Sequence, residues 1–95
     1  MNPTNKTSGD VGVGTTTLMS GQAIVDGINI VAAAADVTVT LYDNTAGSGT
    51  IVAKYILDIS VEGLATYVPL PSVKCTTGLT AVVSGTGAEA IVHYR

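Results

Sequence analysis

The chain has 95 residues, of which only 12% are charged, and its net charge at pH 7 is −3. This length predicts one small domain that buries about 60–65% of its unfolded surface. The four basic residues are scattered, so no concentration of positive charge predicts nucleic-acid binding. No apolar run approaches the roughly 18 residues of a membrane span, and the single cysteine, Cys75, excludes an internal disulfide.

The composition favours strands over helices. Valine and threonine, both β-branched, make up 27 residues, whereas Trp and Phe are absent. A core must therefore be built from Val, Ile, Leu and Ala. A surface with so little charge predicts either a neutral soluble domain or, as we prefer, a domain whose faces are covered by other subunits.

The first fourteen residues are polar and rich in Asn, Thr and Gly. Because they lack the apolar residues needed to order themselves, we predict a flexible N-terminal arm over 1–14 and a β-domain over 15–95. Val11 and Val13 alternate with glycines, so the end of the arm could add a strand to the edge of a neighbouring sheet. The arm also lacks the apolar core of a signal peptide, which predicts synthesis in the cytoplasm of the producing cell.

Two strands are expected next, over Thr15–Ser20 and Gln22–Ala32. The dipeptide Asp26-Gly27 interrupts the second strand and predicts either a tight turn or a bulge, since glycine accepts a positive φ. The alanine tract 32–35 has helix propensity but is too short to form an isolated helix, so we predict a turn that ends at Asp36.

The centre of the domain is a predicted hairpin over Asp36–Leu57. Apolar and polar residues alternate on both sides of a turn that begins at Asp43-Asn44, the pattern of strands with one buried face. The residues predicted to face the core are Val37, Val39, Leu41, Ile51, Ala53 and Leu57. The residues predicted to face outward are Thr38, Thr40 and Lys54.

The rest of the chain alternates short strands with turns. Residues 58–63 are predicted as a connection and Leu64–Leu70 as a strand at a sheet edge, because Pro69 and Pro71 cannot donate to a ladder. Further strands are expected over Val73–Thr77, Leu79–Ser84 and Glu89–Tyr94. This series predicts an all-β fold, a small antiparallel β-sandwich or a jelly-roll-like domain, with essentially no helix.

No group of residues predicts catalysis, a cofactor or a metal. The loop 43–49 has oxygen ligands and glycines, but it lacks the further carboxylates of a calcium loop. His93 has no second histidine or nucleophile at a suitable spacing, and we interpret Cys75 as a small buried apolar residue. We therefore expect a protein that is not an enzyme and has no small-molecule substrate.

The four tyrosines are the best candidates for contact residues. Tyrosine joins a large apolar body to a polar tip and is common at protein interfaces and in sugar-binding grooves. Without Trp or Phe, a stacking platform for carbohydrate would be weak, which favours the subunit contact. The predicted interface residues are Val11, Val13, Tyr42, Tyr55, Tyr67 and Tyr94.

Two longer stretches carry a resemblance to a known group of proteins. These are VTVTLYDNTAGSGTIVAK and GLTAVVSGTGAEAIVHYR, together with the turn between Ile30 and Asp36. The region of about 27–95 resembles short β-sandwich proteins encoded among the structural genes of tailed bacteriophages. The resemblance does not extend over the first twenty residues.

This resemblance implies a virion component of the capsid decoration, or cement, type. Such a protein is expected on the outer surface of the capsid, where it binds the major capsid protein and itself, as a homotrimer. A trimeric tail, neck or fibre module is the alternative within the virion. A carbohydrate-binding module is the alternative of another class.

Overall fold

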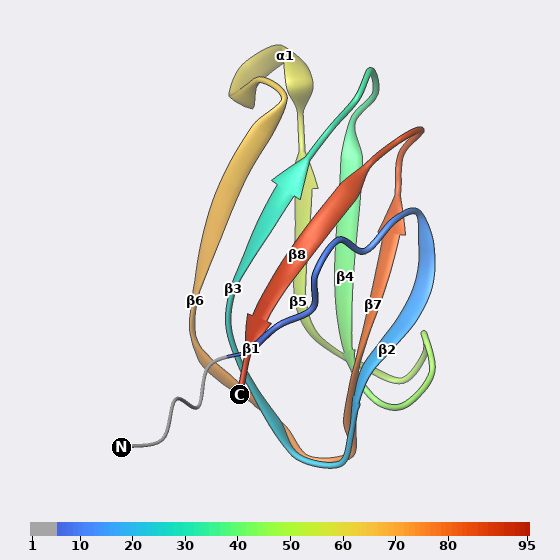
Figure 1. Ribbon diagram of the computed structural model, residues 1–95, viewed down its shortest axis with the longest axis vertical. Coiled ribbons are helices and arrows are strands. Elements are labelled where there is room, and N and C mark those ends of the chain that lie inside the picture. Colours follow the sequence, from blue (N-terminus) through green and yellow to red (C-terminus); the bar gives the residue numbers. More distant parts are fainter. Residues whose placement is uncertain (1–5) are drawn as a thin grey trace.

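The structure, a computed structural model, describes residues 6–95. In that range eight strands form two antiparallel four-stranded sheets that pack face to face (Figure 1). Sheet A has the strand order β1-β8-β3-β6, and sheet B has the order β2-β7-β4-β5. The bounds are β1 Lys6–Thr7, β2 Gly14–Ser20, β3 Ala23–Val31, β4 Val37–Asp43, β5 Thr50–Leu57, β6 Ala65–Cys75, β7 Gly78–Ser84 and β8 Glu89–Tyr94.

The pairings between strands are nested. Strand β4 pairs with β5, β3 with β6, β2 with β7 and β1 with β8. The chain therefore behaves as one long hairpin, closed at the β4–β5 turn and rolled so that its strands fall into two sheets. This is the jelly-roll arrangement, and it confirms the predicted all-β sandwich class.

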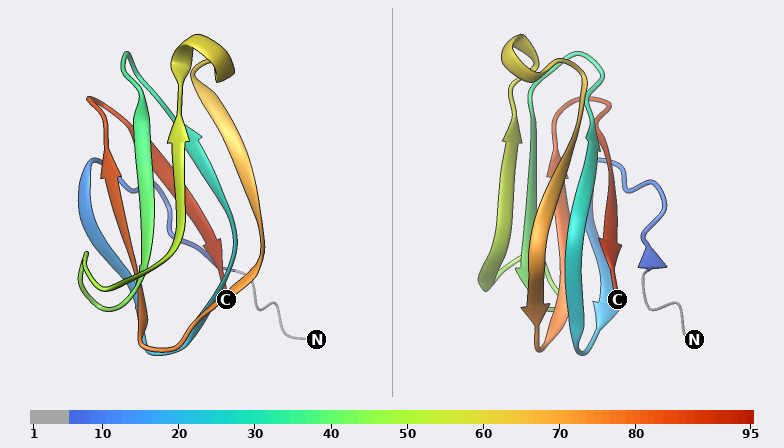
Figure 2. Two further views of the ribbon diagram at one scale, coloured as in Figure 1. Left: turned by 180° about the vertical axis from the view of Figure 1, so that it is seen from behind. Right: turned by 90° about the vertical axis from the view of Figure 1, so that its left-hand side faces the viewer.

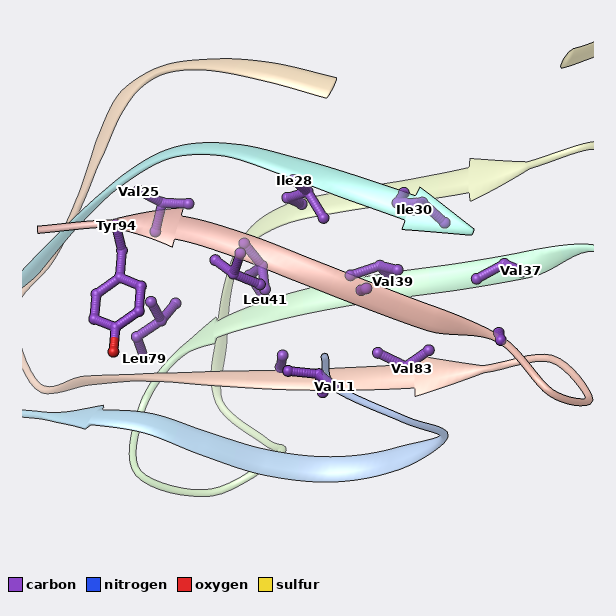
Figure 3. Close-up of a cluster of buried hydrophobic side chains, with 14 of the residues drawn as sticks. Val11, Val25, Ile28, Ile30, Val37, Val39, Leu41, Leu79, Val83 and Tyr94 are labelled. Carbon is purple, nitrogen blue, oxygen red and sulfur yellow. The ribbon is translucent and has the colours of Figure 1, made fainter. Parts of the chain in front are cut away.

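The core lies between the two sheets and is made mainly of aliphatic side chains (Figure 3). Among the described residues, the Tyr94 ring is buried in it and Tyr55 packs against it. Alternation places Val37, Val39 and Leu41 on the inner face of β4, where each is fully buried. They meet the inner face of β3, which contributes Ile28 and Ile30. The predicted inner face of β4 is thus confirmed, as is the burial of Leu57 on β5.

One residue of the hairpin lies on the opposite face from the one predicted. Ile51 is 50% exposed, because the pairing passes from Leu41–Ala53 to Tyr42–Ile51 and leaves Val52 as an extra residue. This bulge shifts the alternation by one residue and turns Ile51 outward. Ala53 is only half-buried.

The predicted outward face of the hairpin is only partly exposed. Lys54 is exposed as predicted, and Thr38 is half-buried. Thr40 is buried, at 7% exposure, because it lies between its cross-strand neighbours Lys54 and Val82.

The structure differs from the predicted arm over residues 6–14. Strand β1 pairs with β8, and Val11 exchanges backbone hydrogen bonds of 2.8 and 2.9 Å with Ala90. The Val11 side chain is buried in the core, so this stretch completes the edge of its own sheet. Residues 1–5 of the predicted arm lie outside the described residues.

The Asp26-Gly27 dipeptide forms a bulge rather than a turn. On the β8 side, the pairing passes from Val25–Tyr94 to Gly27–His93, which leaves Asp26 as the extra residue. On the other side of β3, β6 is one continuous edge strand where two strands were predicted, and both prolines lie in it.

The predicted connection 58–63 contains a single helical turn, α1, over Ile59–Glu62. The Asp58 carboxylate accepts a hydrogen bond from the Ser60 backbone N–H and so caps the turn. Four helical residues leave the fold essentially all-β, and among the described residues no helix is long enough to cross a membrane.

Candidate assembly surfaces

Exposed apolar side chains are concentrated on one side of the sandwich. Among the described residues, five of the seven exposed large apolar side chains belong to the continuous stretch from β5 through α1 to β6. A sixth, Val31, lies at the end of β3 and pairs with Ala65 of β6. The seven are Val13, Val31, Ile51, Ile56, Val61, Leu64 and Tyr67.

One end of this side forms an apolar surface, which we name the apolar end and define by Val31, Ile56, Val61 and Leu64. Two connections hold it together: the Ala32 N–H donates to the Leu64 carbonyl at 2.7 Å, and the Ile59 N–H donates to the Asp36 carboxylate at 3.1 Å. The most exposed member is Val61 of α1, at 79%. Figure 2 shows α1 and the β3–β4 turn at this end.

A groove runs along the same side between strands β5 and β6, and we name it the side groove. Its volume is about 330 Å³, and its lining is predominantly apolar. The lining residues are Ile28, Val52, Ala53, Lys54, Tyr55, Val68, Leu70, Pro71 and Val73. Lys54 is the one charged residue among them.

The side groove has a structural cause in β6. Pairing with β3 passes from Val25–Val73 to Gly27–Pro69, so two residue steps of β3 oppose four of β6. The additional residues include Ser72, whose φ of 51° lies in the left-handed region. The strand arches at this point and places Leu70 and Pro71 along the groove.

An ion pair stabilises this arch. Arg95 donates from Nε to Oδ2 of Asp26 at 3.0 Å and from Nη2 to Oδ1 at 3.2 Å, and the Ser72 hydroxyl donates to the same carboxylate. The hydrogen bond from Arg95 is the main reason why the pKa of Asp26 lies below its ordinary value. Because the pair is exposed, we assign it a positional role and only a small part of the stability.

The four tyrosines occupy four different environments. Tyr42 is half-buried on the outer face of β4, and Tyr55 is half-buried along the side groove. Tyr67 is half exposed on the outer face of sheet A, where its ring makes an edge contact with His93. Tyr94 is buried in the core, with its hydroxyl 3.4 Å from the Leu18 carbonyl.

Of the six predicted interface residues, Val11 and Tyr94 offer no free surface, since both side chains pack inside the sandwich. Tyr94 shares a strand face with Ala90 and Val92, an alternation in EAIVHY that already indicates an inward position. Val13 follows two residues after Val11 and is 57% exposed, because the chain bends at Val13 before β2 begins. Contact by Val13, Tyr42, Tyr55 and Tyr67 stays a prediction.

The loop 43–49 is stabilised by backbone groups. The Asp43 carboxylate accepts hydrogen bonds from the N–H groups of Thr76, Thr77 and Gly78, at 3.0, 2.8 and 3.3 Å. These donors, led by Thr77, hold the pKa of Asp43 below its ordinary value. No three described His, Cys, Asp or Glu side chains gather as metal ligands.

His93 and Cys75 have structural surroundings. The His93 imidazole lies within hydrogen-bonding distance of the Asn29 side chain, on the outer face of sheet A. Cys75 is fully buried, as predicted, and burial raises the pKa of its thiol.

Sequence reasoning missed both the apolar end and the side groove. A signal for the first was present, because the predicted connection 58–63 and the residue after it contain three large apolar residues, Ile59, Val61 and Leu64. A solvated connection has no need of them. The groove depends on the register of β6 against β3, which the sequence does not display.

Comparison with known proteins gives little beyond this geometry. No protein-family profile matches the sequence, and no curated protein matches it. Among solved structures, the chain is similar to that of a virus-like particle of the extra small virus (XSV) of the giant freshwater prawn Macrobrachium rosenbergii. The identity is 15%, the match covers 99% of this chain and 80% of that chain, and the TM-score is 0.36. We therefore base the jelly-roll assignment on strand order alone.

Proposed function

We propose that this protein is a virion structural component of the capsid decoration type, which binds the lattice of the major capsid protein as a homotrimer and stabilises the head. The observation that carries this proposal is the apolar end. Four large apolar side chains are exposed there on a small domain, and contiguous exposed apolar surface is typical of sites that bind another protein.

The composition supports an assembly role. Only 12% of the residues are charged, so the faces offer few of the charges that keep a free domain from associating. The two stretches that resemble bacteriophage structural proteins coincide with the β4–β5 hairpin and with β7–β8. They supply three of the four inner strands, β4, β7 and β8, together with most of the edge strand β5. Their role here is to build the domain that presents the apolar end.

The mechanism requires contact area rather than chemistry. Burial of the apolar end against a capsid subunit removes apolar surface from water, at about 25 cal/mol per Å². A single contact of this size is weak. A trimer that binds three equivalent positions at once converts modest contacts into strong attachment, and repetition over the lattice resists outward pressure.

Binding to purified particles tests the proposal. The double variant Val61→Asp/Leu64→Asp places two charges on the apolar end, and we expect it to lose particle binding while it keeps its fold. The matched control, Ser20→Asp/Ser48→Asp, adds the same charge at two exposed residues at the opposite end of the sandwich and should bind as the wild type does. Equal binding by both double variants would overturn this assignment of the surface.

Copy number separates the capsid proposal from the tail, neck or fibre alternative. Quantitative analysis of particles should give a number that scales with the capsid lattice. A small fixed number per particle would favour the alternative.

The exposed Tyr67 supports a second candidate of another class, a carbohydrate-binding module. Its ring stands on the outer face of sheet A beside the polar groups of His93 and Asn29. Binding on a glycan array that is lost in Tyr67→Ala would favour this candidate over the capsid proposal.

A further inference from the structure

Strand β3 contains Asp26-Gly27, the single Asp-Gly dipeptide of the sequence. When glycine follows an aspartate, its backbone nitrogen can attack the aspartate side-chain carboxyl carbon readily, because glycine has no side chain to hinder the approach. The other four aspartates precede Val, Asn or Ile, which are bulkier. The sequence therefore concentrates this reactivity at one position of an inner strand.

The sheet restrains Asp26 less than its neighbours in β3. Pairing with β8 passes from Val25 directly to Gly27, and pairing with β6 skips the same residue. Among the described strands, Asp26 is thus the one residue of β3 without a partner in either pairing, as expected for the extra residue of a bulge. Its side chain is 23% exposed, so water has access to the carboxyl group.

Three hydrogen bonds restrain the Asp26 carboxylate. Nε and Nη2 of Arg95 and the Ser72 hydroxyl donate to its two oxygens, which fixes the orientation of the group. Donors of this kind also stabilise the ionised form, in accord with the lowered pKa of Asp26. Cyclisation requires the carboxyl oxygen to leave as water, which needs the protonated form. The ion pair therefore opposes the reaction both by geometry and by charge.

We infer that Asp26-Gly27 is a site of spontaneous isoaspartate formation and that the ion pair with Arg95 controls its rate. In the first step the Gly27 nitrogen bonds to Cγ of Asp26, the C–OH bond of the carboxyl group breaks, and the hydroxyl leaves with the amide proton as one water. In the second step one water opens the resulting succinimide. Opening at Cγ restores aspartate, whereas opening at the former backbone carbonyl leaves Gly27 joined through Cγ, which is isoaspartate.

The product alters the arch of β6. Isoaspartate adds one carbon atom to the backbone of β3 between β6 and β8, and its free carboxylate comes from the former backbone carbonyl. Arg95 and Ser72 then lose their acceptor at its present position. Since Ser72 lies in the arch that places Leu70 and Pro71 along the side groove, the modification changes the shape of the groove. The inference concerns the chain itself and does not rest on the proposed function.

Incubation of the folded full chain in water enriched in heavy oxygen, at neutral pH, tests the inference by peptide mapping and mass spectrometry. We expect isoaspartate that carries heavy oxygen to accumulate at residue 26 and not at the other aspartates. Arg95→Ala should raise the rate several-fold, and Arg95→Lys, which keeps a cation, should give a rate between the two. The matched control is Asp36→Ala, which removes a hydrogen bond at the opposite end of the sandwich and should leave the rate unchanged.

Three outcomes would overturn the inference. The first is the absence of isoaspartate at residue 26 from the wild type and from both Arg95 variants. The second is an equal rate in the wild type and in these variants. The third is an equal acceleration by Asp36→Ala, which would assign the effect to general loosening of the fold. Circular dichroism shows whether each variant is folded, and Arg95→Lys provides the comparison with the wild type if Arg95→Ala is not.

Discussion

The two long sides of the sandwich are both made of sheet edges, but they are closed in different ways. On the β1–β2 side, the chain crosses between the sheets and Val11 fills the space beneath it. On the β5–β6 side, the crossing goes through α1 at one end, and the remaining length is the side groove. The first side is rich in threonine and glycine, whereas the second exposes isoleucine, valine and leucine.

This difference shows that the edge strands of one fold can be covered on one side and left open to association on the other. A sheet edge that remains open invites association, and natural proteins cover or blunt the edges that must not associate. The loop 44–49 adds to the cover on the β2 side, because the hydroxyl groups of Thr17 and Thr80 donate to the carbonyls of Thr45 and Asn44. No described segment covers the side groove in the same way.

The largest expected effect comes from breaking the closed side. Val11→Asp buries a charge without a partner and should destabilise the fold by on the order of 3 kcal/mol or more. Its neighbour Val13 is exposed, so Val13→Asp should change stability little. Denaturant unfolding at several protein concentrations measures both, because a contribution from association would change with concentration. Similar values for the two variants would mean that Val11 does not close this side.

A smaller effect is expected from the hydrogen bonds that join Asp43, at the end of β4, to the β6–β7 turn. Asp43→Ala leaves the three N–H groups of Thr76, Thr77 and Gly78 without their acceptor, and we expect the melting temperature to fall by several degrees. Asp36→Ala removes the acceptor of one N–H group at the apolar end and should have the weaker effect. A larger fall in melting temperature for Asp36→Ala than for Asp43→Ala would contradict this ranking.

The smallest effect is a dependence of stability on pH. The pKa values of Asp26, Asp43 and Asp58 are all lowered in the folded state by hydrogen bonds, so the unfolded chain binds protons first as the pH falls. The stabilisation is therefore complete above the ordinary aspartate pKa of 3.8 and is lost as the pH falls through the lower folded values. Thermal unfolding between pH 6 and pH 3 should show a smaller loss for Asp43→Ala than for the wild type.

Most of the fold could be predicted from the sequence because alternation is local. The strands β4, β5, β7 and β8 lie within one residue of their predicted bounds, since each is rich in β-branched residues and is flanked by turn residues. Ile51 was assigned to the wrong face because a bulge depends on the partner strand. Residues 6–11 were predicted as flexible because their partner, β8, lies more than 75 residues further along the chain.

The candidate surfaces were harder to predict than the fold. Tyr67 and Tyr94 were both predicted as interface residues. Tyr67 is half exposed, so its contact stays a prediction, whereas Tyr94 is buried, as its alternation with Val92 already indicated. The side groove arises from four residue steps of β6 against two of β3, a mismatch that appears only when the two strands are aligned. Surfaces of this kind depend on contacts between segments that are far apart in the sequence. A single sequence shows only patterns among residues that are close together along the chain.

The nested pairing of strands also has a kinetic consequence. Only β4 and β5 are close together in sequence, whereas β8 has to join both β1 and β3 to complete sheet A. During synthesis the central hairpin can form early, but the inner position of sheet A stays vacant until residue 94 has left the ribosome. Pairing over such distances makes folding slow. Until β8 has paired with β3, the backbone groups on that edge of β3 can form hydrogen bonds with a strand of another chain.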